Sequence, residues 1–234
     1  MRLLLAALCI AMPIEALASS CYAFVENMRE RDVGVQVASL DFVSTKPREV
    51  TITYVAHSTF RIETEEGVTI ATDFFGTAGR TKEGAPIRPD VVTMNHAHST
   101  HYTDNPDPEI PYVLRGWNHD GKGPANHRLR VGDVTIRNVT THIRAWGVPE
   151  ENGNSIFVFE VADLCIGHLG HLHHVLSEEQ YAEVGRLDVV MAPVDGTFTL
   201  DLPGMIEVLK TMKTRVVLPM HAFGTYSLEL FLQG

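Results

Sequence analysis

The sequence has few cysteines, no clusters of basic residues and no long apolar run. Only three of its 234 residues are cysteine, which is too few for the dense disulfide frameworks of small secreted domains. Lysine and arginine total 19 against 29 acidic residues, for a formal net charge of -10. The basic residues form no cluster of the kind that neutralises phosphates, so we expect no nucleic-acid partner.

The apolar run nearest the N-terminus, residues 3–12, is too short to span a bilayer, and no stable membrane insertion is expected. A short basic start precedes this run, and Ala16-Leu17-Ala18 provides a small-x-small cleavage site. This pattern is typical of a signal peptide over residues 1–18 and predicts export to the periplasm or the medium. A buried N-terminal helix and a lipid anchor on Cys21 are the alternatives.

The composition, with 44% hydrophobic and 21% charged residues, fits one globular domain with a sizeable core. We expect residues 19–49 to be a surface lead-in and residues 50–234 to form the folded domain. Once Cys9 is removed with the signal peptide, Cys21 and Cys165 remain. Because Cys165 lies in an apolar run, we interpret it as a core thiol and predict no disulfide framework.

The two halves of the domain differ in their hydrophobic pattern. Alternating segments at 50–55, 59–64 and 68–71 predict an antiparallel meander. In the second half strands alternate with helices, of which one begins at the capping box Ser-Glu-Glu-Gln of residues 177–180 and another at Asp201. Residues 152–154, Asn-Gly-Asn, are predicted to form the turn before a strand pair.

The most informative stretch is Val91–His101, Val-Val-Thr-Met-Asn-His-Ala-His-Ser-Thr-His. Its apolar start predicts a buried strand, and three histidines follow where that strand would end. In an extended turn His96 and His98 point the same way and can bind one ion, whereas His101 is offset as a ligand of a second ion would be. A solvated histidine-rich loop is the alternative for this window taken alone.

Three more predicted strands also end in histidine. Those ending near residues 139, 166 and 218 are followed by His142, by the histidine-rich stretch 168–174 and by His221. Because a rigid metal site collects its ligands from separate strands, the four strand ends together predict a metal centre. His119 and His127 are interpreted as surface residues.

Through these motifs the chain resembles the metallo-β-lactamase superfamily, in particular the branch similar to ascorbate-phosphate lactonases and phospholipase-D-type phosphodiesterases. The family's H-x-H-x-D-H motif corresponds to residues 96–101, its next histidine to His142, its H-L-G-D-L-G-H stretch to 168–174 and its P-M-H to 219–221. The resemblance covers roughly residues 50 to 232. It implies an α/β fold, a four-layer αββα sandwich with a dinuclear site at one edge of the sheets.

The chain departs from the family's pattern at two aspartates, which are replaced by Thr100 and His171. Carried over residue by residue, the resemblance implies one ion at His96, His98 and His142 and a second at His101, His171 and His221. Without a bridging carboxylate the second ion should bind more weakly, and the surplus positive charge should favour bound hydroxide. Thr100 and His171 are the candidate catalytic residues, although Thr100 can only hydrogen-bond a bound water and is no general base.

The expected function is an exported hydrolase that uses metal-bound hydroxide on an ester, lactone or phosphodiester of a small-molecule substrate. Zinc, in two ions, is the expected metal because imidazole suits it, and manganese, iron, nickel and copper also accept imidazole. The alternative is a non-catalytic metal-binding or ligand-sensing relative that has lost the two aspartates. Family members commonly continue beyond the helix near residue 228, so we expect the chain to be truncated at its C-terminus.

Overall fold

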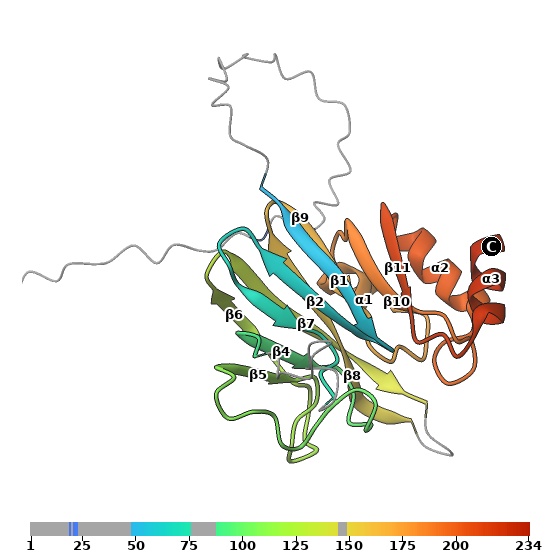
Figure 1. The fold of residues 1–234 in the computed structure, drawn as a ribbon. Coiled ribbons are helices and arrows are strands. Elements are labelled where there is room, and N and C mark those ends of the chain that lie inside the picture. Colours follow the sequence, from blue (N-terminus) through green and yellow to red (C-terminus); the bar gives the residue numbers. More distant parts are fainter. Residues whose placement is uncertain (1–18, 20, 23–47, 76–87, 145–148) are drawn as a thin grey trace, which may run out of the picture.

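The computed structural model describes residues 19, 21–22, 48–75, 88–144 and 149–234, which form two β-sheets packed face to face (Figure 1). The first sheet has the strand order β1-β2-β3-β4-β5 and the second the order β11-β10-β9-β8-β7-β6. The strands are β1 (Val50–Ala56), β2 (Thr59–Thr64), β3 (Thr69–Ala71), β4 (Val91–Met94), β5 (Tyr112–Arg115), β6 (Arg128–Val131), β7 (Val134–Ile143), β8 (Glu150–Val161), β9 (Leu164–His168), β10 (Val189–Pro193) and β11 (Val216–Met220).

The predicted meander is present, because β1, β2 and β3 pair in antiparallel fashion. Parallel pairs follow where the chain crosses over, between β9 and β10 and between β10 and β11. Strand β8 shows how the sandwich is filled. Its residues Phe157 and Phe159 point into the core between the sheets, whereas Ile156 and Val158 point into the core beneath the helices. Both faces of this strand are therefore buried, which explains its unbroken apolar run.

The described helices, α1 (Glu178–Val184), α2 (Leu202–Met212) and α3 (Thr225–Gln233), lie beside the second sheet (Figure 1). The capping box predicted at Ser177 is present, since its side chain accepts from the Gln180 amide and the Gln180 side chain accepts from the Ser177 amide. Asp201 caps α2 by accepting from the Gly204 amide at 2.8 Å. Both caps place these helices as the sequence predicts.

On the outer face of the first sheet the covering layer is a loop. Val92 and Met94, which alternate with the inward-facing Val91, pack there with Ile110 and with the partly buried Tyr102 and Trp117. No helix covers this face within the described ranges. The predicted α/β class and its two packed sheets are confirmed. Among the described residues, loop residues take the place of the second helical layer of the predicted αββα sandwich on this side.

One local prediction was wrong, and one short strand was missed. Strand β8 begins at Glu150, so residues 152–154 lie within the strand instead of forming a turn. Asn152 has a φ of 58° beside a register shift between Thr141 and Ile143 of β7. Asparagine tolerates this left-handed conformation, which lets a bulge form while the pairing continues. The short strand β5 was not predicted, because four residues after Pro111 carry too little pattern.

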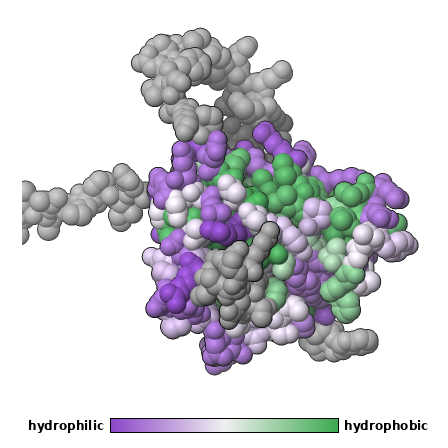
Figure 2. All heavy atoms as spheres, viewed as in Figure 1, coloured by the Kyte–Doolittle hydropathy of each residue, from purple (hydrophilic) through white to green (hydrophobic). Residues whose placement is uncertain are grey.

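The central core reaches the surface at one edge of the sandwich. Figure 2 shows hydrophobic side chains gathered over β1 and the neighbouring β10 and β11, where the partly buried Val50, Ile52 and Leu218 pack against that core. Both β1 and β11 are edge strands of their sheets. Among the helices described, none has the length and apolar character needed to cross a bilayer.

The prediction that Cys165 is an unpaired core thiol was wrong. Cys165 is fully buried as expected, but it forms a disulfide with Cys21 across a sequence separation of 144 residues. The Cys21 carbonyl also accepts from the Arg186 amide at 2.7 Å. Two cysteines so far apart give no pairing signal in a sequence, and only the fold brings them together. The predicted signal peptide lies outside the described residues, as does most of the predicted lead-in.

Reduction of this disulfide should destabilise the domain, because the bond restricts the unfolded chain over a long loop. We expect a loss of about 2–4 kcal/mol, or roughly 5–15 °C in Tm for a chain of this size. Thermal unfolding with and without dithiothreitol measures the loss. A Cys165→Ser variant should already melt at the lower temperature and should not respond to the reductant. An equal response of both proteins would contradict the assignment.

Candidate metal centre

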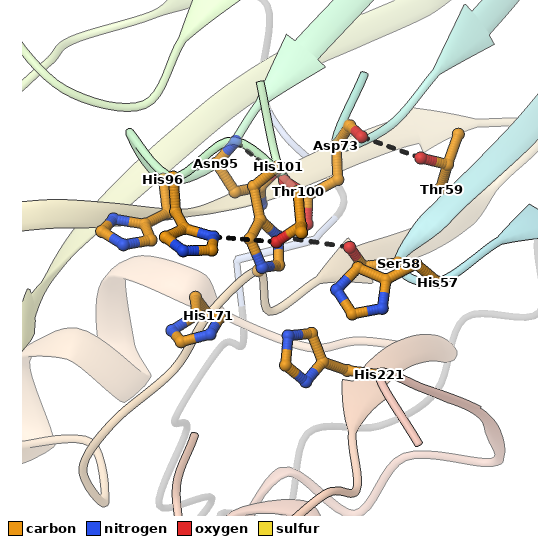
Figure 3. A network of polar contacts seen from close by, with 12 residues as sticks. His57, Ser58, Thr59, Asp73, Asn95, His96, Thr100, His101, His171 and His221 are labelled. Atoms are coloured by element: carbon orange, nitrogen blue, oxygen red, sulfur yellow. Dashed lines mark hydrogen bonds and ion pairs between the residues drawn. The ribbon is translucent and has the colours of Figure 1, made fainter. Parts of the chain in front are cut away.

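Histidines from four separate places in the chain converge at one end of the two sheets (Figure 3). His57 lies in the turn between β1 and β2, His101 follows β4, His171 follows β9 and His221 follows β11. The ring centroids lie 4.2 Å apart for His57 and His221, 4.7 Å for His101 and His171, and 4.9 Å for His171 and His221. His96 joins them, with its ring 5.2 Å from that of His171.

Three of these side chains are close enough to hold one ion. One ligand nitrogen from each of His57, His101 and His221 lies within 4.8 Å of the others. The Nε2 atoms of His57 and His101 are buried and have no hydrogen-bond partner among the described residues. A buried polar atom without a partner is costly, whereas an imidazole nitrogen is a good ligand for a divalent metal. The donor set therefore fits a metal ion.

Two buried carboxylates orient this set from behind. Asp73 Oδ2 lies 2.6 Å from His101 Nδ1, and Asp195 Oδ1 lies 3.0 Å from His221 Nδ1. When Nδ1 donates its proton to a carboxylate, the lone pair of Nε2 is free for a metal. The same logic holds for His96, whose Nδ1 lies 2.8 Å from the Gly153 carbonyl oxygen.

Both carboxylates are held ionised. Burial alone would raise the pKa of Asp73, but the neighbouring His101, by its charge and its hydrogen bond, brings that pKa below the ordinary value. Burial opposes ionisation of Asp195 in the same way, and hydrogen bonds from His221 and Thr199 lower its pKa. Two negative charges therefore lie directly behind the imidazoles. No carboxylate at this site had been predicted from the sequence.

Three of the neighbouring histidines, His57, His96 and His171, are by contrast held neutral. Burial, reinforced by neighbouring imidazoles, lowers the pKa of His57 to about 4. Burial also lowers the pKa of His96 to about 4 and that of His171 to about 2. A neutral imidazole has the lone pair that metal binding requires. These three side chains are therefore in a ligating protonation state at neutral pH.

The backbone at the site adopts conformations that residues other than glycine rarely take. His57 has a φ of 52°, Asp73 of 43° and His221 of 59°. The His221 amide donates to the His57 carbonyl at 3.0 Å, which ties the two turns together. Left-handed backbone at non-glycine residues persists where the surroundings enforce it, and such residues are concentrated at functional sites.

Two asparagines lie beneath the histidines. The Asn95 side chain joins the sheets by donating to the Ser155 carbonyl at 2.7 Å, and its backbone amide donates to Asp73 Oδ1 at 2.9 Å. Asn154 Oδ1 accepts from the backbone amide of His171 at 2.8 Å. The turn before His171 passes so close that a Cβ on Gly170, whose φ is 61°, would lie 2.4 Å from Asn154 Oδ1. Sequence reasoning missed both roles, because an amide side chain at a strand end carries no distinctive pattern.

His168 supports the site and is not among its converging rings. Its Nδ1 accepts from the Gly170 amide at 3.1 Å, so the proton must be on Nε2, which donates to the Ser58 carbonyl at 2.7 Å. The side chain is fully buried. His168 thereby connects the end of β9 to the turn that carries His57.

The structure brings together some of the predicted ligands and separates others. His96, His101, His171 and His221 converge. His98 is exposed, with its ring 6.2 Å from those of His96 and His101 and its Nδ1 2.9 Å from Thr100 Oγ1.

His142 is also exposed, and its neighbour is the His174 ring at 5.6 Å. The ligand roles predicted for the histidines stay predictions. His57 was not among the predicted ligands, although its position just after an alternating strand matches that of the other histidines.

A cleft of about 1000 Å³ opens beside the histidines. Its walls combine histidines and threonines with one arginine and two phenylalanines. The lining residues are His57, His98, Thr100, Arg144, His171, His173, Thr197, Phe198, His221 and Phe223. A concave site with convergent polar groups is the usual form of a small-molecule binding site.

Comparison with known proteins agrees with this geometry. Residues 51–221 match the family model described as the beta-lactamase superfamily domain. The chain is 27% identical over 188 residues to a UPF0173 metal-dependent hydrolase of Salinibacter ruber, covering 73% of this chain and 83% of that protein. A second UPF0173 metal-dependent hydrolase, from Archaeoglobus fulgidus, is 23% identical over 76% of this chain and 84% of its own length.

Solved structures share the fold. A protein from Thermotoga maritima, assigned as a zinc-dependent hydrolase of the metallo-β-lactamase superfamily, has a TM-score of 0.57 and 28% identity, covering 79% of this chain and 85% of that one. A Parabacteroides distasonis protein assigned as a metal-dependent hydrolase has a TM-score of 0.59 at 15% identity, covering 78% and 87%. The chain belongs to the metallo-β-lactamase superfamily.

Removing the charge of either supporting carboxylate should weaken metal binding without removing a ligand. We expect Asp73→Asn and Asp195→Asn each to lower zinc affinity about 10- to 100-fold. Each substitution removes the carboxylate that orients its histidine partner and makes that imidazole more basic. Competition with a chromophoric chelator measures the affinity. Asp201→Asn is the matched control, since asparagine also caps a helix. Unchanged affinity in both site variants would show that the carboxylates do not support a metal.

Proposed function

We propose that this protein is a metal-dependent hydrolase that cleaves an ester, lactone or phosphodiester bond of a small molecule. The proposal rests on the cluster of His57, His101 and His221. The buried Nε2 atoms of His57 and His101 have no partner among the described residues, and Asp73 and Asp195 lie behind the cluster. The relatives named metal-dependent hydrolases support it.

A divalent ion at this cluster would supply Lewis-acid activation of water and of the substrate's carbonyl or phosphoryl oxygen. Zinc is the expected ion because all the candidate ligands are imidazoles. His96 and His171 lie beside the cluster with ring centroids 5.2 Å apart and are the candidates for a second ion. Thr100 lines the cleft, and its hydroxyl would hydrogen-bond a bound water or the substrate.

Metal content and hydrolysis should depend on the same three histidines. We expect His57→Ala, His101→Ala and His221→Ala each to lower zinc affinity by at least about 100-fold, since each removes a ligand and leaves its partners unsatisfied. Elemental analysis after dialysis measures the bound ion, and hydrolysis is followed with p-nitrophenyl acetate, an aryl lactone and bis-p-nitrophenyl phosphate. Chelation should abolish turnover, and added zinc or manganese should restore it.

Two histidines serve as controls. His119→Ala removes an exposed loop histidine and should change nothing. His142→Ala tests the ligand role predicted from the resemblance, and the structure leads us to expect no loss of metal. Hydrolysis that continues after chelation would contradict a metal-dependent mechanism. Firm metal binding with no turnover of any of the three substrates would favour the non-catalytic, ligand-sensing alternative.

We further propose that the protein is exported. The Cys21–Cys165 disulfide supports an oxidising compartment, and residues 1–18 have the pattern of a signal peptide. In a bacterial host the mature protein should be recovered in the periplasm or the medium, with its N-terminus just after residue 18 by mass spectrometry. Recovery of the full-length, reduced chain in the cytoplasmic fraction would contradict export.

A further inference from the structure

The cleft beside the histidines has a charge opposite to that of the molecule. The chain carries a formal net charge of -10, yet the residues lining the cleft include Arg144 and no carboxylate. Within the described part of the chain, Arg144 forms no ion pair with an acidic side chain. A cation without a counter-charge in a concave site attracts anions and repels cations.

The position of Arg144 is fixed by the opposite wall. Its NH2 group donates to the carbonyl oxygens of Thr197 and Thr199, at 3.0 and 3.4 Å. A guanidinium has five N–H donors, so this anchoring occupies a small part of its capacity. The remaining donors suit a planar acceptor such as a carboxylate, sulfonate or phosphate.

The wall that anchors Arg144 is itself held by Asp195. Oδ2 of Asp195 accepts from the amides of Thr197, Phe198 and Thr199, at 2.9, 2.6 and 3.2 Å. The same carboxylate orients His221 through its other oxygen. One side chain therefore fixes both a candidate metal ligand and the rim of the cleft.

That rim presents two aromatic rings to solvent. Phe198 is 63% exposed and Phe223 is 64% exposed, and their centroids lie 5.4 Å apart in an edge-to-face pair. The Phe223 ring also lies 5.0 Å from that of His221. Exposed aromatic rings on a fixed backbone, next to polar groups, are typical of a ligand-binding groove. They would gain burial from an apolar group of a ligand.

Resting on the proposed function, we propose that the cleft selects amphipathic anions: substrates with an acyl or aromatic group that packs on Phe198 and Phe223 and an anionic group that binds Arg144. The hydrolysable bond would lie between these features and the histidines. A neutral polar substrate would neither pack on the phenylalanines nor pair with Arg144, and a cationic substrate would be repelled by Arg144.

A matched pair of fluorescent probes tests this without turnover. 8-Anilinonaphthalene-1-sulfonate and N-phenyl-1-naphthylamine share their aromatic rings and differ only in the sulfonate. In titrations of the zinc-loaded protein, we expect Arg144→Gln to weaken the sulfonate probe about tenfold and to leave the neutral probe unchanged. Phe198→Ala should weaken both probes by roughly three- to tenfold, and Arg144→Lys should restore part of the sulfonate binding.

Tyr226→Ala is the control, since Tyr226 is 74% exposed but does not line the cleft. It should affect neither probe. If Tyr226→Ala weakens the probes as much as Phe198→Ala, the probes bind elsewhere and the proposal is overturned. It is also overturned if Arg144→Gln weakens both probes equally or neither.

Substrate pairs test the same selectivity during turnover. Monomethyl adipate and methyl hexanoate share their leaving group and chain length and differ in a terminal carboxylate, so the adipate ester should have the higher kcat/KM by about tenfold. Arg144→Gln should abolish this preference, and equal kcat/KM for the two esters in the native protein would overturn the proposal. Should neither ester be hydrolysed while the probe discrimination holds, ester hydrolysis fails as the function and the anion selectivity of the cleft stands.

Discussion

The site depends on two buried pairs of carboxylate and imidazole, Asp73 with His101 and Asp195 with His221. A carboxylate removed from water costs several kcal/mol unless it is paired and hydrogen-bonded. Each of these has a histidine partner and further donors, from Asn95 in one case and from the 197–199 loop in the other. Because the pairing turns each Nε2 toward the common space, satisfying the carboxylates also assembles the candidate metal centre.

The second consequence of these pairs is electrostatic. The candidate ligands converging at the site are all imidazoles, so a cation bound there would have no carboxylate in direct contact. Asp73 and Asp195 supply negative charge one hydrogen bond further away, where it lowers the cost of concentrating positive charge. His57 and His96, whose pKa values burial lowers, would provide lone pairs without adding repulsion.

The sandwich explains why such distant residues meet. Strands from both sheets end at the same side of the molecule, and the loops that follow them carry His57, His101, His171 and His221 (Figure 3). Asn95 and Asn154 lie between the sheets and hold these loops in register. Phe223 shares the loop of His221, whereas Phe198 follows β10 and Arg144 follows β7. Asp195 connects them, because it accepts from the 197–199 amides and pairs with His221.

By itself the sequence determined the class of fold, the capped helices and three of the four strand ends that histidine follows, because hydrophobic periodicity and capping are local properties of the chain. The fourth strand, β7, runs on to Ile143 and contains His142. Through the resemblance the sequence also predicted one dinuclear site, with His96, His98, His101, His142, His171 and His221 as its ligands. Only the tertiary structure decided that His57 belongs with them, that His142 lies beside His174, and that Cys21 and Cys165 form a disulfide. These contacts join residues far apart in sequence, and their geometry is set by how the two sheets pack.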